Sequence, residues 1–198
     1  MNGFEKRTNT KRSSIRHAAL ALFKQYGIAK VSMNEIARQA NVAQATLFNY
    51  FGSKSGLIEF LLTDLMDQQM ERHITVLNSD LSFPEKTRRL LLGEVEILKE
   101  ISFVYREPGG SEHAAIQALF AKYQKEKVMP FYLQYIRKGQ ADGHIPAHYP
   151  AQTIAIYMEM YRSQLSRMFE MLPDVEHEEL LQDLVELFFY GLNGSRVH

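Results

Sequence analysis

Apolar residues recur three or four positions apart along almost the whole chain, which is the spacing of amphipathic helices. The sequence contains no alternating pattern typical of strands and no two-residue hairpin signal. In the first third of the chain this pattern predicts three short helices, at residues 10–26, 32–40 and 43–50. Gly27 stops the first of them, and Asn41 makes the turn between the second and the third.

The rest of the chain predicts longer helices, interrupted by proline and glycine. They are expected at residues 54–77, 82–103, 111–130, 130–139, 150–171 and 173–191. Pro130 marks a kink or a new helix, because a proline ring clashes with the preceding turn. The fold class is therefore all-α with about nine helices. The chain is expected to divide into an N-terminal domain at residues 1–53 and a C-terminal domain at residues 54–198.

The two short helices at residues 32–40 and 43–50 are predicted to form a helix-turn-helix. Ser32 and Glu35 are spaced as a capping box, in which each side chain satisfies a backbone N–H of the other. Val42, Leu47 and Phe48 are expected to pack inward. In this motif the second helix enters the major groove of DNA.

The outward side chains of the second short helix suit contacts with DNA. Gln44 and Asn49 can pair with the edge of adenine, and the methyl group of Ala45 can meet that of thymine. Thr46, Tyr50 and Lys54 suit phosphate oxygens, and the free N–H groups at Ser32 offer a second phosphate site. For any one of these residues, an ordinary solvated helix face is the competing interpretation.

The charge distribution supports a nucleic-acid partner. The chain as a whole has no net charge, yet residues 1–54 carry nine basic and two acidic side chains, a net charge of +7 that residues 55–198 balance with −7. Such a division favours an N-terminal domain that meets a polyanion. A basic surface formed by chance is the alternative.

Residues 26–54, from Tyr26-Gly27-Ile28 to Gly52-Ser53-Lys54, resemble the DNA-binding domain of TetR-family regulators. The resemblance implies an all-helical homodimer with a helix-turn-helix DNA-binding domain at residues 1–53 and a ligand-binding and dimerisation domain at residues 54–198. Such a protein is usually a repressor that a small molecule releases from a palindromic double-stranded operator. It also implies that Thr46, Tyr50 and Lys54 contact phosphates and that Gln44, Ala45 and Asn49 read bases. One departure is Ala43, because the family usually has a serine or threonine at this position as the helix N-cap. The absence of this cap is expected to lower the stability by about 1 kcal/mol.

The second part of the chain is rich in aromatic residues and methionine. One interpretation is an apolar pocket for an unknown small-molecule effector, and the other is plain hydrophobic core. The pocket candidates are Met66, Met70, Phe103, Phe120, Tyr123, Tyr132, Tyr157 and Tyr161. If residues 54–198 enclosed no pocket, the protein would instead be a DNA-bound adaptor that recruits a protein partner.

The last two predicted helices carry more apolar residues than one contact face needs, which favours a two-fold dimer interface over a helix wedged inside a monomer. The interface candidates are Met158, Leu165, Leu181, Val185 and Phe188.

Other functional classes are not expected. The chain has no cysteine, and no nucleophile motif, metal site or cofactor site is predicted, so an enzyme is not expected. No segment has the apolar length of a signal peptide or a membrane span. We therefore expect no membrane partner, and we expect the protein to be cytoplasmic.

Overall fold

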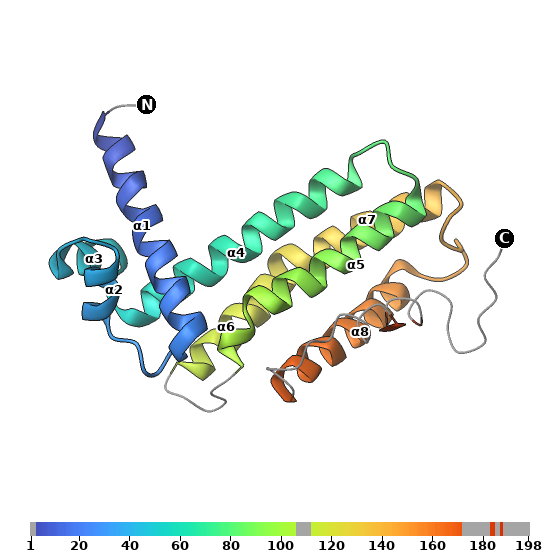
Figure 1. Cartoon of the computed structure of the whole chain (residues 1–198). Coiled ribbons are helices and arrows are strands. Elements are labelled where there is room, and N and C mark those ends of the chain that lie inside the picture. The colour runs from blue at the N-terminus through green and yellow to red at the C-terminus, as the bar shows by residue number, and fades with distance from the viewer. Residues whose placement is uncertain (1–2, 106–111, 172–182, 185–186, 188–198) are drawn as a thin grey trace. The chain divides into compact units, whose positions relative to one another are not determined.

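The computed structural model describes residues 3–105, 112–171, 183–184 and 187, and all its regular elements are helical (Figure 1). They are α1 (Gly3–Tyr26), α2 (Met33–Gln39), α3 (Gln44–Phe51), α4 (Lys54–Leu77), α5 (Phe83–Glu100), η1 (Ser102–Val104), α6 (His113–Tyr123), η2 (Gln124–Val128), α7 (Met129–Ala141) and α8 (Ala151–Met171). The predicted all-α class is confirmed. The predicted number of nine helices is not matched within these residues.

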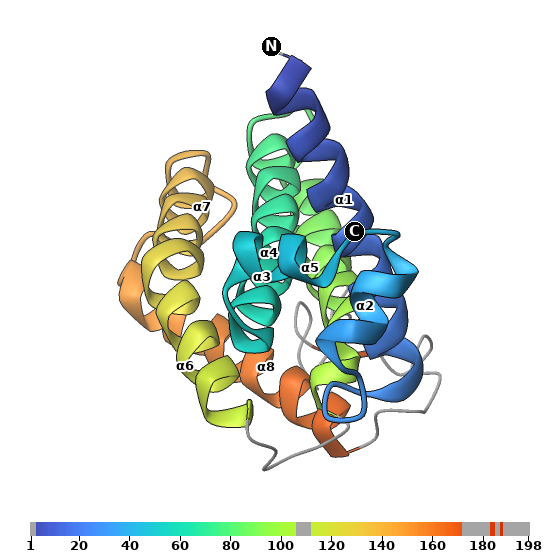
Figure 2. The same cartoon turned by 90° about the vertical axis from the view of Figure 1, so that its left-hand side faces the viewer.

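The difference in number comes from the middle of the chain and from its end. α6, η2 and α7 follow one another without a break (Figure 2). Besides the short 3-10 helix η1, the described residues therefore form seven separate helices. η2 is a π-helical turn, closed by a hydrogen bond from the Met129 N–H to the Gln124 carbonyl. This wider turn stands directly before Pro130, whose ring would otherwise clash with the preceding carbonyl. The predicted kink at Pro130 is therefore a π-turn. The helix predicted at residues 173–191 falls almost entirely outside the described residues, as do the break and cap predicted at residues 108–111.

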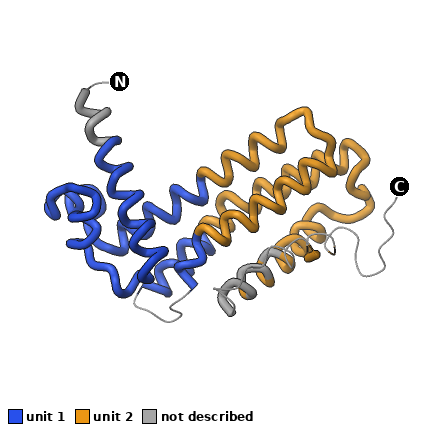
Figure 3. Tube along the Cα trace, viewed as in Figure 1, with its two compact units in different colours: residues 1–67, 101–122 blue, residues 68–100, 123–198 orange. Residues whose placement is uncertain are grey.

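The chain packs as two compact units, residues 1–67 with 101–122 and residues 68–100 with 123–198 (Figure 3). The core of the first unit is built on α1, where Ile15, Ala19 and Phe23 are fully buried at helical spacing. Phe23 stacks on Phe103 of η1, with their ring centroids 6.1 Å apart. This division rests on packing, and the predicted functional boundary at residue 53 stays a prediction.

The core of the second unit contains residues of α5 and α7. Leu90, Ile97 and Leu98 of α5 are buried, and so is Ile136 of α7. The hydroxyl groups of Thr87 and Tyr135 lie 2.6 Å apart and tie the two helices together by a buried hydrogen bond.

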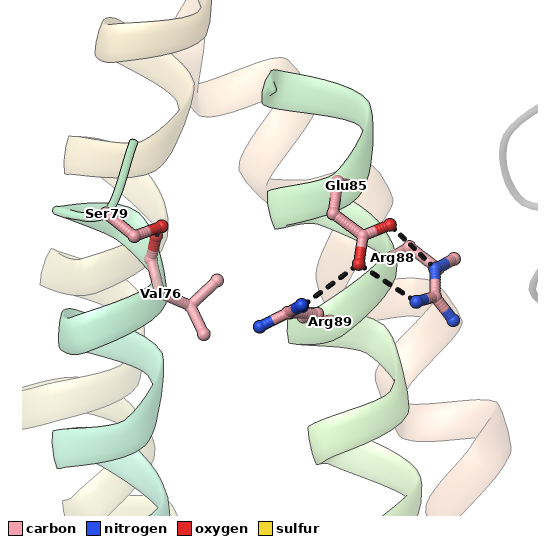
Figure 4. Close-up of polar contacts among 5 residues, drawn as sticks. All are labelled: Val76, Ser79, Glu85, Arg88 and Arg89. Atoms are coloured by element: carbon pink, nitrogen blue, oxygen red, sulfur yellow. Dashed lines mark hydrogen bonds and ion pairs between the residues drawn. The ribbon is translucent and has the colours of Figure 1, made fainter. Parts of the chain in front are cut away.

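Polar contacts mark the turn between α4 and α5 (Figure 4). The Ser79 hydroxyl donates to the Val76 carbonyl at 2.7 Å, near the end of α4. In the first turn of α5, Glu85 accepts hydrogen bonds from Arg88 and Arg89 at 2.9 Å. These hydrogen bonds lower the pKa of Glu85 to about 2, and those from Arg88 have the largest effect. An acid in a first turn also suits the positive end of the helix dipole.

Two details of the N-terminal helices differ from the prediction. α1 begins at Gly3 rather than at residue 10, because no proline stands in this stretch to stop the helix. Phe48 was expected to pack inward, but it is 40% exposed, since Leu47 alone of α3 is buried against its neighbours. None of the helices among the described residues is long and apolar enough to cross a membrane.

Candidate nucleic-acid interface

The turn between α2 and α3 has the geometry that a helix-turn-helix requires. Asn41 follows the last turn of α2 with a φ of +53°, in the left-handed region that asparagine tolerates. The Val42 N–H donates to the Ala37 carbonyl at 3.0 Å, and the Asn41 N–H donates to the Arg38 carbonyl at 3.2 Å. These two bonds form a Schellman motif, which ends α2 sharply and sets the direction in which α3 begins.

The start of α2 is fixed by the predicted capping box, which the structure confirms. The Ser32 hydroxyl accepts from the Glu35 N–H at 3.3 Å, and the Ser32 N–H donates to the Glu35 carboxylate at 2.8 Å. Hydrogen bonds from the backbone and side chain of Ser32 lower the pKa of Glu35. Glu35 is therefore ionised near neutral pH and already occupies the Ser32 N–H, so a phosphate at this helix end would meet a carboxylate. The assignment of Ser32 as a phosphate contact stays a prediction.

α3 carries the candidate base readers on its surface. Gln44, Ala45 and Asn49 are all exposed, while Leu47 on the opposite side is fully buried. Ala43 precedes the helix with φ −67° and ψ 142°, which is the backbone of an N-cap, but it makes no side-chain capping bond. α3 therefore exposes these three side chains and lacks a side-chain cap at its first turn.

The candidate phosphate contacts lie at both ends of α3. Thr46 and Tyr50 are half-buried. Lys54, in the first turn of α4, is held near the α1–α2 connection by a hydrogen bond of 3.5 Å from its Nζ to the Ala29 carbonyl. These three side chains and the exposed Gln44, Ala45 and Asn49 of α3 all belong to the first unit.

Arg12 is a neighbour of this surface that the sequence analysis missed. Its guanidinium carbon lies 5.8 Å from the centroid of the Tyr50 ring and 5.7 Å from that of Phe60. Phe51 packs on Phe60 with centroids 5.0 Å apart. The available signal was the spacing of Arg12 and Arg16, four residues apart, which places both on one face of α1.

The pocket candidates are divided between the two units. Met66, Phe103 and Phe120 belong to the first, and Phe103 is part of its core against Phe23. The candidates in the second unit are Met70, Tyr123, Tyr132, Tyr157 and Tyr161. Of these, Met70, Tyr123 and Tyr132 are buried, Tyr161 is half-buried and Tyr157 is 50% exposed. The assignment of these residues to a pocket stays a prediction.

A buried polar cluster lies beside these candidates in the second unit. The Gln69 amide and the Nε2 of His73 are 2.7 Å apart, and the Nδ1 of His73 lies 3.7 Å from Glu94. Arg72 donates to the Gln69 carbonyl oxygen at 2.8 Å, so the amide nitrogen points at His73, whose Nε2 must accept. Tyr132 donates to Glu94 at 3.1 Å. Burial lowers the pKa of His73, against the opposing effect of Glu94, and the ring is neutral near pH 7.

The dimer candidates are described only in part. Met158 of α8 is buried within its own unit, and its neighbours Ile156, Tyr157 and Met160 are 61%, 50% and 62% exposed. The side chain of Leu165 and all of Leu181, Val185 and Phe188 lie outside the described residues. The exposed apolar side chains of α8 therefore lie one or two positions from Met158, and the assignment of the interface residues stays a prediction.

Comparisons with known proteins agree with this geometry. Residues 15–61 match the profile of the family described as bacterial regulatory proteins, tetR family. The chain is 23% identical to an uncharacterized HTH-type transcriptional regulator of Bacillus subtilis, YhgD, over 91% of this chain and 96% of that protein. The fold is similar to that of the fatty acid degradation regulator FadR from Bacillus halodurans, with a TM-score of 0.76 at 17% identity, covering 93% of this chain and 97% of that one. FadR from Bacillus subtilis in complex with stearoyl-CoA gives a TM-score of 0.68 at 17% identity, covering 91% and 98%.

Proposed function

Because this chain belongs to the tetR family of bacterial regulatory proteins, we propose that it is a transcriptional repressor in the cytoplasm. It binds a palindromic operator as a homodimer, and a small molecule releases it from the DNA. The observation that carries the proposal is the exposed face of α3. Gln44, Ala45 and Asn49 lie free on a helix whose direction is set by the Schellman motif after α2. A helix so held can enter the major groove and present hydrogen-bonding groups to base edges.

The homodimer is needed for the operator to be read twice. A two-fold dimer places two copies of α3 on half-sites separated by about 34 Å or a multiple of it. The exposed apolar side chains Ile156, Tyr157 and Met160 of α8 support an interface there, because large apolar groups gain free energy when a partner covers them. Met158 would then support this helix from inside its own unit.

The effector is proposed to be small and largely apolar, and to bind in the second unit near Met70 and Tyr132. The likeness in fold to a regulator bound to stearoyl-CoA makes a long acyl chain, supplied as acyl-CoA, the first apolar group to test. Such a ligand would bind the state of the protein that does not fit the operator, and the difference in affinity between the two states would drive release.

The proposal is tested with the purified full chain and a labelled duplex from the DNA upstream of its own gene. Fluorescence anisotropy should show saturable binding that is tighter than to a shuffled duplex and weakens steeply as salt rises. Equal affinity for the two duplexes would reject operator recognition.

Release is tested by adding stearoyl-CoA to the complex, with coenzyme A alone as the matched control. Dissociation by stearoyl-CoA alone supports an acyl-chain effector. A complex that resists both, in a protein that binds its operator, would reject this effector class and favour the DNA-bound adaptor.

A further inference from the structure

The guanidinium of Arg12 lies near two aromatic rings of its own unit. Its guanidinium is within 6 Å of the ring centroids of both Tyr50 and Phe60, which is the range of a cation–π contact. The Arg12 side chain is nevertheless exposed. It is therefore both held by its neighbours and open to a partner.

A second contact one turn further along α1 explains why Arg12 points there. Arg16 forms an ion pair with Asp64 of α4, with 2.6 Å between its Nε and the carboxylate. Arg12 and Arg16 are four residues apart on α1, and Phe60 and Asp64 are four residues apart on α4, so the two contacts lie one above the other. This pair of contacts fixes the side of α1 that faces α4.

The N–H groups of the Arg12 guanidinium suit an anion. A guanidinium that packs its flat face on a ring keeps its N–H groups in the plane, where they can donate. In the part of the chain that the structure describes, no carboxylate forms an ion pair with Arg12. The neighbouring Tyr50 hydroxyl is a candidate phosphate contact, so a phosphate there would meet both groups.

We propose that Arg12 is a further DNA-contact residue, which donates to a backbone phosphate beside the one bound by Tyr50. This inference rests on the proposed function, since it adds a contact to the same interface. The contact carries no base information, so it acts on every DNA sequence alike. Its signature is the release of one counterion for each protomer.

The test compares the wild type with Arg12→Gln, Arg12→Lys and the matched control Lys24→Gln, which removes one charge from the last turn of the same helix. Lys24 is exposed and lies twelve residues, or about 18 Å, further along α1. Binding to the upstream duplex and to a random duplex is measured over a range of salt concentrations. Thermal unfolding of each variant shows that it is folded.

Arg12→Gln should reduce the slope of log K against log salt by about one for each protomer, on both duplexes. Arg12→Lys should keep the wild-type slope, and Lys24→Gln should change it by less than half as much as Arg12→Gln. An unchanged slope in Arg12→Gln would show that the residue only supports Tyr50, and equal changes in Arg12→Gln and Lys24→Gln would show a general charge effect. Either result overturns the inference. Loss of sequence preference in the wild type would instead reject operator recognition, while the slope on the random duplex still reports on Arg12.

Discussion

At the scale of single residues, the second unit contains a buried hydrogen-bonded group that tolerates little change. Gly93 of α5 stands opposite the Gln69–His73 pair of α4, and a Cβ built there would lie 2.2 Å from the Gln69 Nε2 and 2.7 Å from the His73 Nε2. The glycine therefore provides room for the pair. Neither the buried pair nor the need for this glycine can be read from helical spacing alone.

We expect Gly93→Ala to lower the free energy of unfolding by up to about 2 kcal/mol. A disturbed buried hydrogen bond costs about 1–3 kcal/mol, and this exceeds the gain of roughly 1 kcal/mol in helix propensity. Urea unfolding followed by circular dichroism measures the change. In a Gln69→Ala background the same substitution should cost less, since the obstructing amide is gone. A stabilised Gly93→Ala protein would contradict the close packing.

His73 should titrate below its ordinary pKa of about 6.5, because burial disfavours the charged ring more than Glu94 favours it. The sign for stability follows directly. Above pH 6.5 the ring is neutral in both the folded and the unfolded chain, and as the pH falls further the unfolded chain binds the proton first, so stability is lost. Proton NMR of the ring gives the pKa, and His73→Gln should flatten the decline in stability below pH 6.5. A pKa at or above 6.5 would contradict this account.

At the scale of helices, the elements that have strong local signals were predicted closely. The capping box at Ser32 and the left-handed Asn41 fix the ends of α2, and both could be recognised from residue type. The early start of α1 and the exposure of Phe48 could not, because they depend on which neighbours cover a helix rather than on its own spacing. Arg12 was missed for the same reason, since its partners lie 38 and 48 residues away in sequence.

The missing cap of α3 gives a prediction for this helix. Ala43 already has the extended backbone of an N-cap, so Ala43→Ser should stabilise the protein by about 1 kcal/mol without rearrangement. Urea unfolding is the measurement, with Ala45→Ser inside the same helix as the matched control. Equal effects of the two substitutions would show that capping is not what α3 lacks.

At the scale of the whole molecule, binding to a palindromic operator as proposed requires two copies of the chain. The exposed Ile156 and Met160 lie four residues apart on one face of α8. We expect Ile156→Glu with Met160→Glu to convert the proposed dimer to a monomer, because the charges buried at its interface would not be paired. Analytical ultracentrifugation measures the change, with Gln134→Glu on the exposed side of α7 as the control. A double variant that stays dimeric would place the interface elsewhere.

Base reading by α3 is tested most directly by Asn49→Ala. The affinity of this variant is measured for the upstream duplex and for a panel of duplexes in which each base pair is changed in turn, and Tyr50→Phe is measured beside it for comparison. We predict that Asn49→Ala loses roughly 1–3 kcal/mol of discrimination at one or two base pairs in each half-site and none elsewhere. Tyr50→Phe should weaken binding to every duplex alike. If Asn49→Ala, Gln44→Ala and Ala45→Gly all keep the wild-type discrimination at every base pair, α3 does not read the operator.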